Sequence, residues 1–189
     1  MSLNPKTLLT EEEYLAIERQ AEFRSEFYGG EMFGMAGATR RHNRIVTNLV
    51  TALDNQMRER PCNVYSTDLR VKIPITGLLT YPDVVVTYGE EMFVDEKQDV
   101  LLNPLLIVEV LSDSTEAYDR GKKFKHYQSI SSMSVYILVA QNAPGVEQYV
   151  RQDDGKIWTC SGTHEIGEII RIEAIDCELK LEDVYAKAD

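Results

Sequence analysis

The stretch Leu105-Leu-Ile-Val-Glu-Val-Leu111 decides the fold, because it is apolar at every position except Glu109. A continuous apolar run of this length predicts a central strand that is covered on both faces. An ionised carboxylate in such a strand is costly unless it binds a proton, pairs with a cation or holds a metal ion. Glu109 is therefore the most informative residue of the chain.

A second apolar strand opens with a carboxylate, in Tyr81-Pro-Asp-Val-Val-Val86. Asp83 precedes Glu109 by 109 − 83 = 26 residues, which is enough for two adjacent strands and a surface loop. Two carboxylates that converge at a sheet would form a hard oxygen site suited to Mg²⁺ or Mn²⁺. Simpler interpretations stay open, with Asp83 as a turn residue after proline and Glu109 as half of a buried salt bridge to a nearby lysine.

The rest of the chain predicts helices and further strands around these two. Thr10 and Glu13 form a capping-box pattern, and Pro61 would end the second helix. We expect helices over residues 11–20, 41–60 and 119–129, a hairpin about Gly29-Gly30, and strands over residues 63–66, 69–73, 81–86, 105–111, 134–139, 146–151, 157–161, 169–172 and 178–181. This order indicates one α/β (α+β) domain over residues 1–189, with a central mixed β-sheet flanked by helices.

Composition excludes several classes of protein. The 189 residues carry 20 Lys and Arg against 31 Asp and Glu, so the net charge is 20 − 31 = −11, which excludes a generally basic nucleic-acid coat but not a local basic groove. There is no CxxC, HExxH, GxGxxG, phosphate-loop or GxSxG motif. No apolar run is long enough for a membrane span and no signal peptide is recognisable, so we expect a cytoplasmic protein with reduced thiols.

Cations follow Glu109 in Asp119-Arg-Gly-Lys-Lys-Phe-Lys-His126. On a helix, Asp119, Lys123 and Tyr127 share one face at i, i+4 and i+8. Lys123 would then lie at the margin of the core, where it could reach the carboxylates. For Lys122 and Lys125 a solvated amphipathic helix is the favoured interpretation.

Two upstream features are also candidates. Glu26 and Glu31 flank the predicted turn, and Glu26 lies between apolar neighbours, so it could point inward. The second helix begins with a basic patch, which is the best local site for an anionic polymer although it also fits a solvated helix terminus. The residues that would contact nucleic acid are Arg40, Arg41, His42, Arg44 and, from the later helix, Arg120. The roles of Glu31, His42 and Asp68 stay open.

Four segments in chain order resemble one known family: FRSEFYGGEM, RRHNRIVTNL, YPDVVV and LIVEVLSDSTEAYDRGKKFKHY. Together they resemble the Uma-type (Uma-two) family of the PD-(D/E)XK nuclease superfamily, over roughly residues 8–150. The resemblance implies the restriction-endonuclease-like fold, with Asp83 in the PD and Glu109 as the (D/E). Leu111 occupies the position of the superfamily's usual lysine, and Lys123 matches the place where the Uma-type pattern carries it.

The resemblance also implies an activity, a metal-dependent endonuclease that hydrolyses phosphodiester bonds, with DNA as the expected substrate. Mg²⁺ or Mn²⁺ would be held by Asp83, Glu109 and the carbonyl group of Val110, with Lys123 beside the reacting water and Glu26 completing the site. A homodimer is expected, because cutting a duplex commonly needs two sites and two-fold symmetry is the commonest assembly. The alternative is a catalytically inactive dimeric nuclease-fold module with a binding or regulatory role, which the net charge and Leu111 favour.

Overall fold

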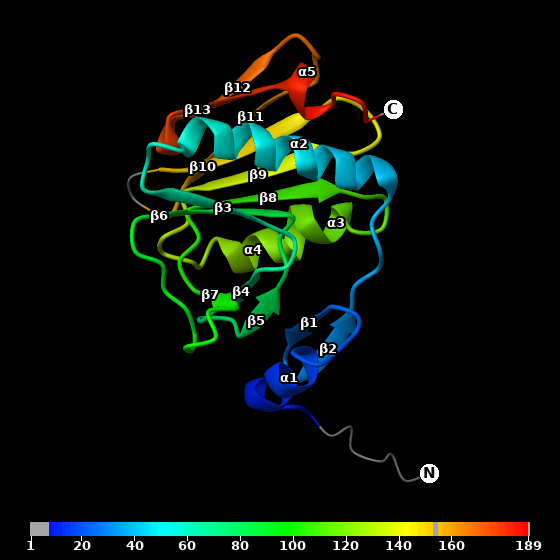
Figure 1. The fold of residues 1–189 in the computed structure, drawn as a ribbon, viewed down its shortest axis with the longest axis vertical. Coiled ribbons are helices and arrows are strands. Elements are labelled where there is room, and N and C mark those ends of the chain that lie inside the picture. Colours follow the sequence, from blue (N-terminus) through cyan, green and yellow to red (C-terminus); the bar gives the residue numbers. More distant parts are fainter. Residues whose placement is uncertain (1–7, 153–154, 189) are drawn as a thin grey trace.

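The computed structural model describes residues 8–152 and 155–188, which form three β-sheets with helices around them (Figure 1). The helices are α1 (Glu11–Glu18), α2 (Arg40–Met57), α3 (Glu116–Tyr118), α4 (Phe124–Tyr127) and α5 (Leu181–Val184), with a π-helical turn over Asp119–Lys123 and a 3-10 turn over Glu173–Ile175. The strands are β1 (Ser25–Tyr28), β2 (Glu31–Gly34), β3 (Cys62–Ser66), β4 (Arg70–Ile73), β5 (Leu78–Thr80), β6 (Val84–Tyr88), β7 (Val100–Leu101), β8 (Leu106–Leu111), β9 (Val135–Ala140), β10 (Val146–Arg151), β11 (Trp158–Thr163), β12 (Ile169–Ile172) and β13 (Cys177–Lys180).

The largest sheet has the strand order β11-β10-β9-β8-β6-β3 and is mixed, because β8 runs parallel to β9 and antiparallel to β6. All six residues of β8 are buried, which confirms the predicted central strand. In Figure 1, α2 lies over one face of this sheet, and α3 and α4 lie over the other. Val108 and Val110 pack in the core with α2, whereas Ile107 and Leu111 pack in the core with Tyr127. Because side chains alternate along a strand, Glu109 faces the α3–α4 side.

The second sheet, of order β2-β1-β5-β4-β7, carries the amino-terminal hairpin. Gly29 and Gly30 have φ angles of 60° and 84°, a left-handed conformation that favours glycine, so the predicted hairpin is confirmed. The predicted capping box of α1 is present between Thr10 and Glu13. The hairpin and α1 lie together at the lower end of Figure 1, where the rings of Tyr14 and Phe27 stack with centroids 4.9 Å apart.

The predicted central mixed sheet is present, and the described residues form two further sheets beside it. The strands β5 and β7 were not predicted, because three and two residues give too short a periodic pattern to recognise. The predicted carboxyl-terminal meander stops at β11, and β12 and β13 pair only with each other among the described residues. Their buried side chains pack into the core under α2 instead of extending the large sheet, as Ile172 and Leu179 show.

All three predicted helices differ in their bounds from those observed. The first is α1 and ends at Glu18 rather than at residue 20. The second helix is α2 and ends at Met57 rather than at residue 60. The helix predicted over 119–129 begins earlier and is divided into α3, the π-helical turn and α4. Its expected face is confirmed, because Asp119, Lys123 and Tyr127 are all buried on the side of Glu109. Within residues 8–152 and 155–188, no helix is long and apolar enough to cross a membrane.

Candidate active site

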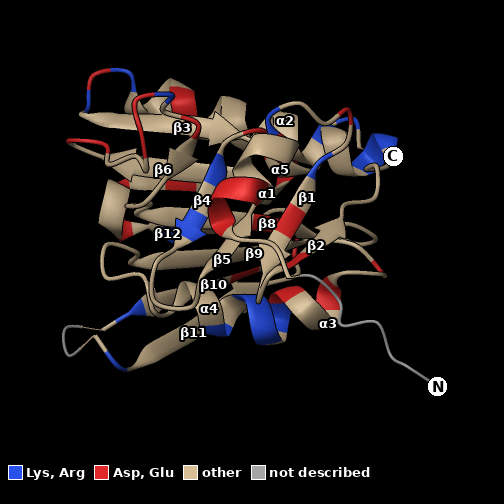
Figure 2. Cartoon of the chain, turned by 90° about the horizontal axis from the view of Figure 1, so that it is seen from below, with Lys and Arg blue, Asp and Glu red and all other residues tan. Residues whose placement is uncertain are grey.

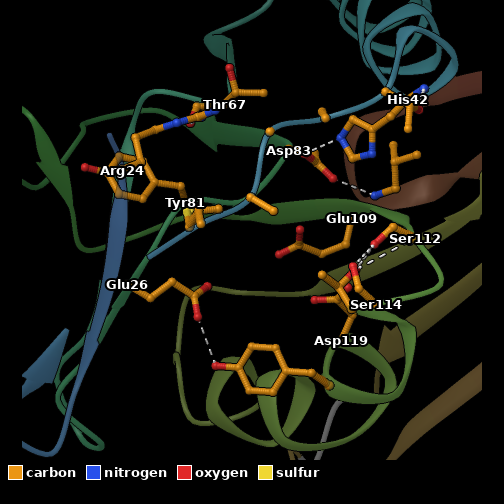
Figure 3. Close-up of a pocket in the computed structure, with 18 of the residues that line it drawn as sticks. Arg24, Glu26, His42, Thr67, Tyr81, Asp83, Glu109, Ser112, Ser114 and Asp119 are labelled. Carbon is orange, nitrogen blue, oxygen red and sulfur yellow. Dashed lines mark hydrogen bonds and ion pairs between the residues drawn. The ribbon is translucent and has the colours of Figure 1, made fainter. Parts of the chain in front are cut away.

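A cavity of about 440 Å³ lies where the β1–β2 hairpin, the start of α2, the strand β8 and the α3 region meet (Figure 3). The four residues predicted to be catalytic, Glu26, Asp83, Glu109 and Lys123, all line it. Val110 and His42 line it as well, and so does the carboxylate of Asp119. The structure therefore brings together side chains from five separate elements or loops of the chain.

Glu109 lies at the base of this cavity and is 3% exposed. Its Oε1 accepts a hydrogen bond of 2.8 Å from the hydroxyl group of Tyr127 and lies 2.8 Å from Nζ of Lys123. Burial raises the pKa of Glu109 above its usual range, and the ammonium of Lys123 opposes that rise without cancelling it. The salt bridge to a nearby lysine, which the sequence left open, is thus present.

Lys123 lies at the centre of the cluster and contacts three carboxylates. It is 4% exposed, and its Nζ lies 2.8 Å from Glu109, 3.5 Å from Glu26 and 3.5 Å from Asp119. Burial alone would lower the pKa of Lys123, but these carboxylates together raise it well above the ordinary value. Burial also raises the pKa of Asp119, again against the effect of Lys123. Lys123 therefore stays protonated near neutral pH.

Asp83 lies just before β6, after Pro82, and both its oxygens are fixed. Oδ2 accepts the backbone N–H of Val110 at 2.8 Å, and Oδ1 lies 2.9 Å from Nε2 of His42. The bond to Val110 secures Asp83 next to the strand position that follows Glu109. Figure 3 shows the Asp83 carboxylate turned toward His42, whereas the Glu109 carboxylate points toward the side of the cavity where Glu26 lies.

Glu26, in the central part of β1, lies on the opposite wall of the cavity. Its Oε1 accepts a hydrogen bond from Oγ1 of Thr80, and its Oε2 accepts one of 3.3 Å from the hydroxyl group of Tyr118. The inward orientation that its apolar neighbours suggested is confirmed. In Figure 2, acidic residues on β1 and near β8 lie in the middle of the molecule.

The donor set fits a hard divalent cation. The Asp, Glu, Lys and Arg side chains that line the cavity are four carboxylates, Lys123 and Arg24, so their formal charge is −4 + 2 = −2, and the ligands on offer are oxygens, which Mg²⁺ and Mn²⁺ prefer. Among the described residues, the hydrogen bonds to Glu109 go to Oε1, which leaves Oε2 for an ion. No three His, Cys, Asp or Glu side chains of the described residues are gathered as a metal shell. An ion would thus depend on Asp83, Glu109, a carbonyl group and water.

The predicted nucleic-acid contacts differ in how exposed they are. Arg41 donates to the carbonyl oxygens of Gln141 and Ala188, and Arg120 bridges Glu116 at 2.7 Å and Glu147 at 2.6 Å. These two cations therefore have internal partners. Arg40 and Arg44 are exposed on the first turns of α2, while the ring of His42 turns into the cavity.

Asp68 and Glu31, whose roles stayed open in the sequence, lie elsewhere in the structure. Other residues of the site were not predicted. Asp68 is exposed and lies 3.3 Å from Arg24, and Glu31 is paired opposite Tyr28 beside the hairpin turn. Sequence reasoning placed Asp119 and Tyr127 on the correct face but gave them no role. It missed Tyr118, which lies in a three-residue helix without a periodic signal.

Comparisons with known proteins show the family of this chain. The Uma2 family, described as "Putative restriction endonuclease", matches residues 11–182. One uncharacterized protein of Synechocystis sp. is 37% identical over 166 residues, which cover 88% of this chain and 92% of that protein. A second one from the same organism is 31% identical over 182 residues, covering 96% and 93%.

A solved structure has the same architecture. The crystal structure of "a putative nuclease belonging to DUF820" from Anabaena variabilis superposes with a TM-score of 0.76 at 17% identity, over 94% of this chain and 98% of that one. This likeness shows the restriction-endonuclease-like α+β fold that the sequence predicted. The chain belongs to the Uma2 family.

Proposed function

We propose that this protein is a metal-dependent nuclease that hydrolyses phosphodiester bonds of DNA, with Mg²⁺ or Mn²⁺ at Asp83 and Glu109. One observation carries the proposal: buried carboxylates surround a single ammonium group in a cavity, with negative charge in excess. A folded protein tolerates such an imbalance where a bound cation or proton balances it. Membership of a family described as a restriction endonuclease family supports the same activity.

A divalent cation bound there would lower the pKa of a bound water molecule and polarise the phosphate. The residues of this chain supply the fixed geometry. Val110 and His42 hold the two oxygens of Asp83, and Tyr127 holds Oε1 of Glu109. Because such groups are already oriented before the reaction, they need little rearrangement in the transition state.

Lys123 acts through its charge. Its raised pKa keeps it protonated, so it is unsuited to accept a proton from water. An ammonium at the base of the cavity can instead stabilise the negative charge that develops on the phosphate. Glu26 and Asp119 hold that ammonium in place.

Two further parts of the proposal concern partners. Nucleic acid would approach over the exposed Arg40 and Arg44 at the start of α2, and this binding should be weak and sensitive to salt because the net charge is −11. A homodimer remains our expectation for the assembly. Light scattering that finds only particles of monomer mass at micromolar concentration would contradict it.

A second candidate function is a catalytically inactive module with a binding or regulatory role. The observation in its favour is the direct contact of Lys123 with Glu109, since a structural ion pair would have the same appearance. The two candidates differ in whether the cluster takes up metal.

Calorimetric titration with Mn²⁺ tests the proposed site. Wild-type protein should release heat on binding, and Asp83→Asn should lose most of it because one of the two carboxylate ligands is neutralised. Asp54→Asn, on the exposed side of α2, is the matched control and should behave as wild type. Equal heats for Asp83→Asn and wild type would exclude the site, and DNA cleavage by the same three proteins tests the activity.

A further inference from the structure

We propose that the cavity takes single-stranded DNA rather than an intact duplex, with Phe33 as the platform on which a base stacks. This inference rests on the proposed nuclease function and names its substrate class. It depends on three properties of the cavity: the depth of the reacting groups, the aromatic side chain in its wall and the scarcity of cations around it.

The reacting groups lie deep. Glu109 and Lys123 are almost completely buried, and the side chains of Asp83 and Glu26 are only 16% and 13% exposed. The connection from β2 to α2, residues 35–39, lines the cavity as well. A DNA duplex is a stiff rod with a persistence length of about 50 nm. It therefore cannot bend sharply enough to bring its phosphates into a cavity of about 440 Å³. A single strand can bend at each nucleotide and enter.

Phe33 lies on the wall of the cavity nearest the solvent. In the hairpin it is directly opposite Glu26, and directly opposed residues of an antiparallel pair share one face of the sheet. Phe33 therefore stands on the face that carries Glu26 to the cavity, and it lines the cavity while remaining 49% exposed. Proteins that bind single strands use aromatic rings of this kind, because every base can stack on them.

The charges favour a single strand too. Among the described residues that line the cavity, the lysine and arginine side chains are Lys123 and Arg24. A duplex carries one negative charge per ~1.7 Å of its axis and is held mainly by many phosphate contacts. A chain with a net charge of −11 lacks the broad basic surface for such contacts. Stacking on Phe33 would supply binding energy that does not depend on cations.

Fluorescence anisotropy with a short labelled strand and with the same sequence as a duplex, both in chelator so that neither is cut, tests the inference. Wild-type protein should bind the single strand more tightly than the duplex. Phe33→Ala and Phe33→Leu should weaken binding of the single strand about tenfold or more, since stacking is worth ~1–3 kcal/mol per base. Phe33→Trp keeps an aromatic face and should retain affinity. Tyr88→Ala, at the exposed far end of β6, is the matched control and should change nothing.

Cleavage of both substrates on a denaturing gel separates this inference from the proposed function. Preferred binding and cutting of the duplex, or an unchanged affinity of Phe33→Ala, would overturn the single-strand inference and leave the nuclease standing. Phe33-dependent binding of the single strand without cleavage would support the substrate class and contradict the proposed hydrolysis. Absence of both binding and cleavage would overturn both.

Discussion

Two ionic clusters of this molecule have similar components but differ in charge balance. In the cavity, Lys123 faces Glu109, Glu26 and Asp119, so negative charge is in excess. In the second cluster, which we call the α1 anchor, Arg19 and Arg70 face Asp95 and Asp99, so two cations meet two anions. Balanced charges suit a structural role, whereas an excess of one sign suits a site that takes up a counter-ion.

The pKa shifts of the two clusters differ in the same way. In the α1 anchor, hydrogen bonds from Arg19 lower the pKa of Asp95 and of Asp99 below the usual value. In the cavity, burial raises the pKa of Glu109 and of Asp119. The carboxylates of the anchor are therefore stabilised as anions by the protein itself. Glu109 and Asp119 are not, and a proton or an external cation has to balance them.

The largest effect should come from Lys123→Met, which removes the only ammonium that contacts the three cavity carboxylates within the described residues. Stranding buried charges of this kind costs about 3–5 kcal/mol of unfolding free energy. The loss should be larger at pH 8 than at pH 5. Without Lys123 the folded-state pKa values of Glu109 and Asp119 rise further, and stability from a raised carboxyl pKa is present at low pH and lost as pH rises.

Urea unfolding of Lys123→Met at the two pH values measures this effect. Lys125→Met is the matched control, because Lys125 is exposed on the next turn, and it should stay within about 0.5 kcal/mol of wild type. An equal loss at both pH values would mean that Lys123 contributes packing and not charge.

A smaller effect of opposite pH dependence is expected in the α1 anchor from Asp99→Asn. Arg70 is buried and would lose its carboxylate partner, but Asp99 is partly exposed, so we expect a cost of about 1–2 kcal/mol at neutral pH. Stability from a depressed carboxyl pKa is present above the ordinary aspartate value and is lost as pH falls through the folded value. The difference between wild type and Asp99→Asn should therefore shrink below about pH 4, which acid titration of thermal melting would show.

The comparison also shows what the sequence could reveal. Glu109 stood out because a carboxylate interrupts an apolar strand, and Asp83 because it opens another, so the acidic half of the cavity was predictable. The α1 anchor was not, because Arg19 and Asp99 are 80 residues apart and neither interrupts a periodic pattern. The strands β5 and β7, which help to bring the segments that carry Arg19 and Asp99 together, were too short to recognise.

Other parts of the site depended on geometry that no spacing fixes. The contact of His42 with Asp83 depends on the connection from β2 to α2, which brings the start of α2 beside the residue that precedes β6. The π-helical turn over Asp119–Lys123 changes the register of a helix by one residue, and its residues other than Asp119 and Gly121 are good helix formers, so propensity does not predict the turn. Helical spacing placed Lys123 within reach of the carboxylates, and the family resemblance indicated it as the lysine of the site.

The smallest expected stability effect belongs to Glu109→Gln, and it separates an enzyme from an inactive module. The amide oxygen can still accept hydrogen bonds from Tyr127 and Lys123, and Lys123 keeps Glu26 and Asp119 as partners. In chelator, the unfolding free energy should therefore stay within about 1 kcal/mol of wild type, since the substitution also relieves a buried charge. Metal-dependent cleavage should disappear, because a ligand oxygen loses its charge. A loss of about 3–5 kcal/mol would instead show that the Glu109–Lys123 pair is structural. Lys123 would then be a counter-ion, and the cavity cluster would have the same role as the α1 anchor.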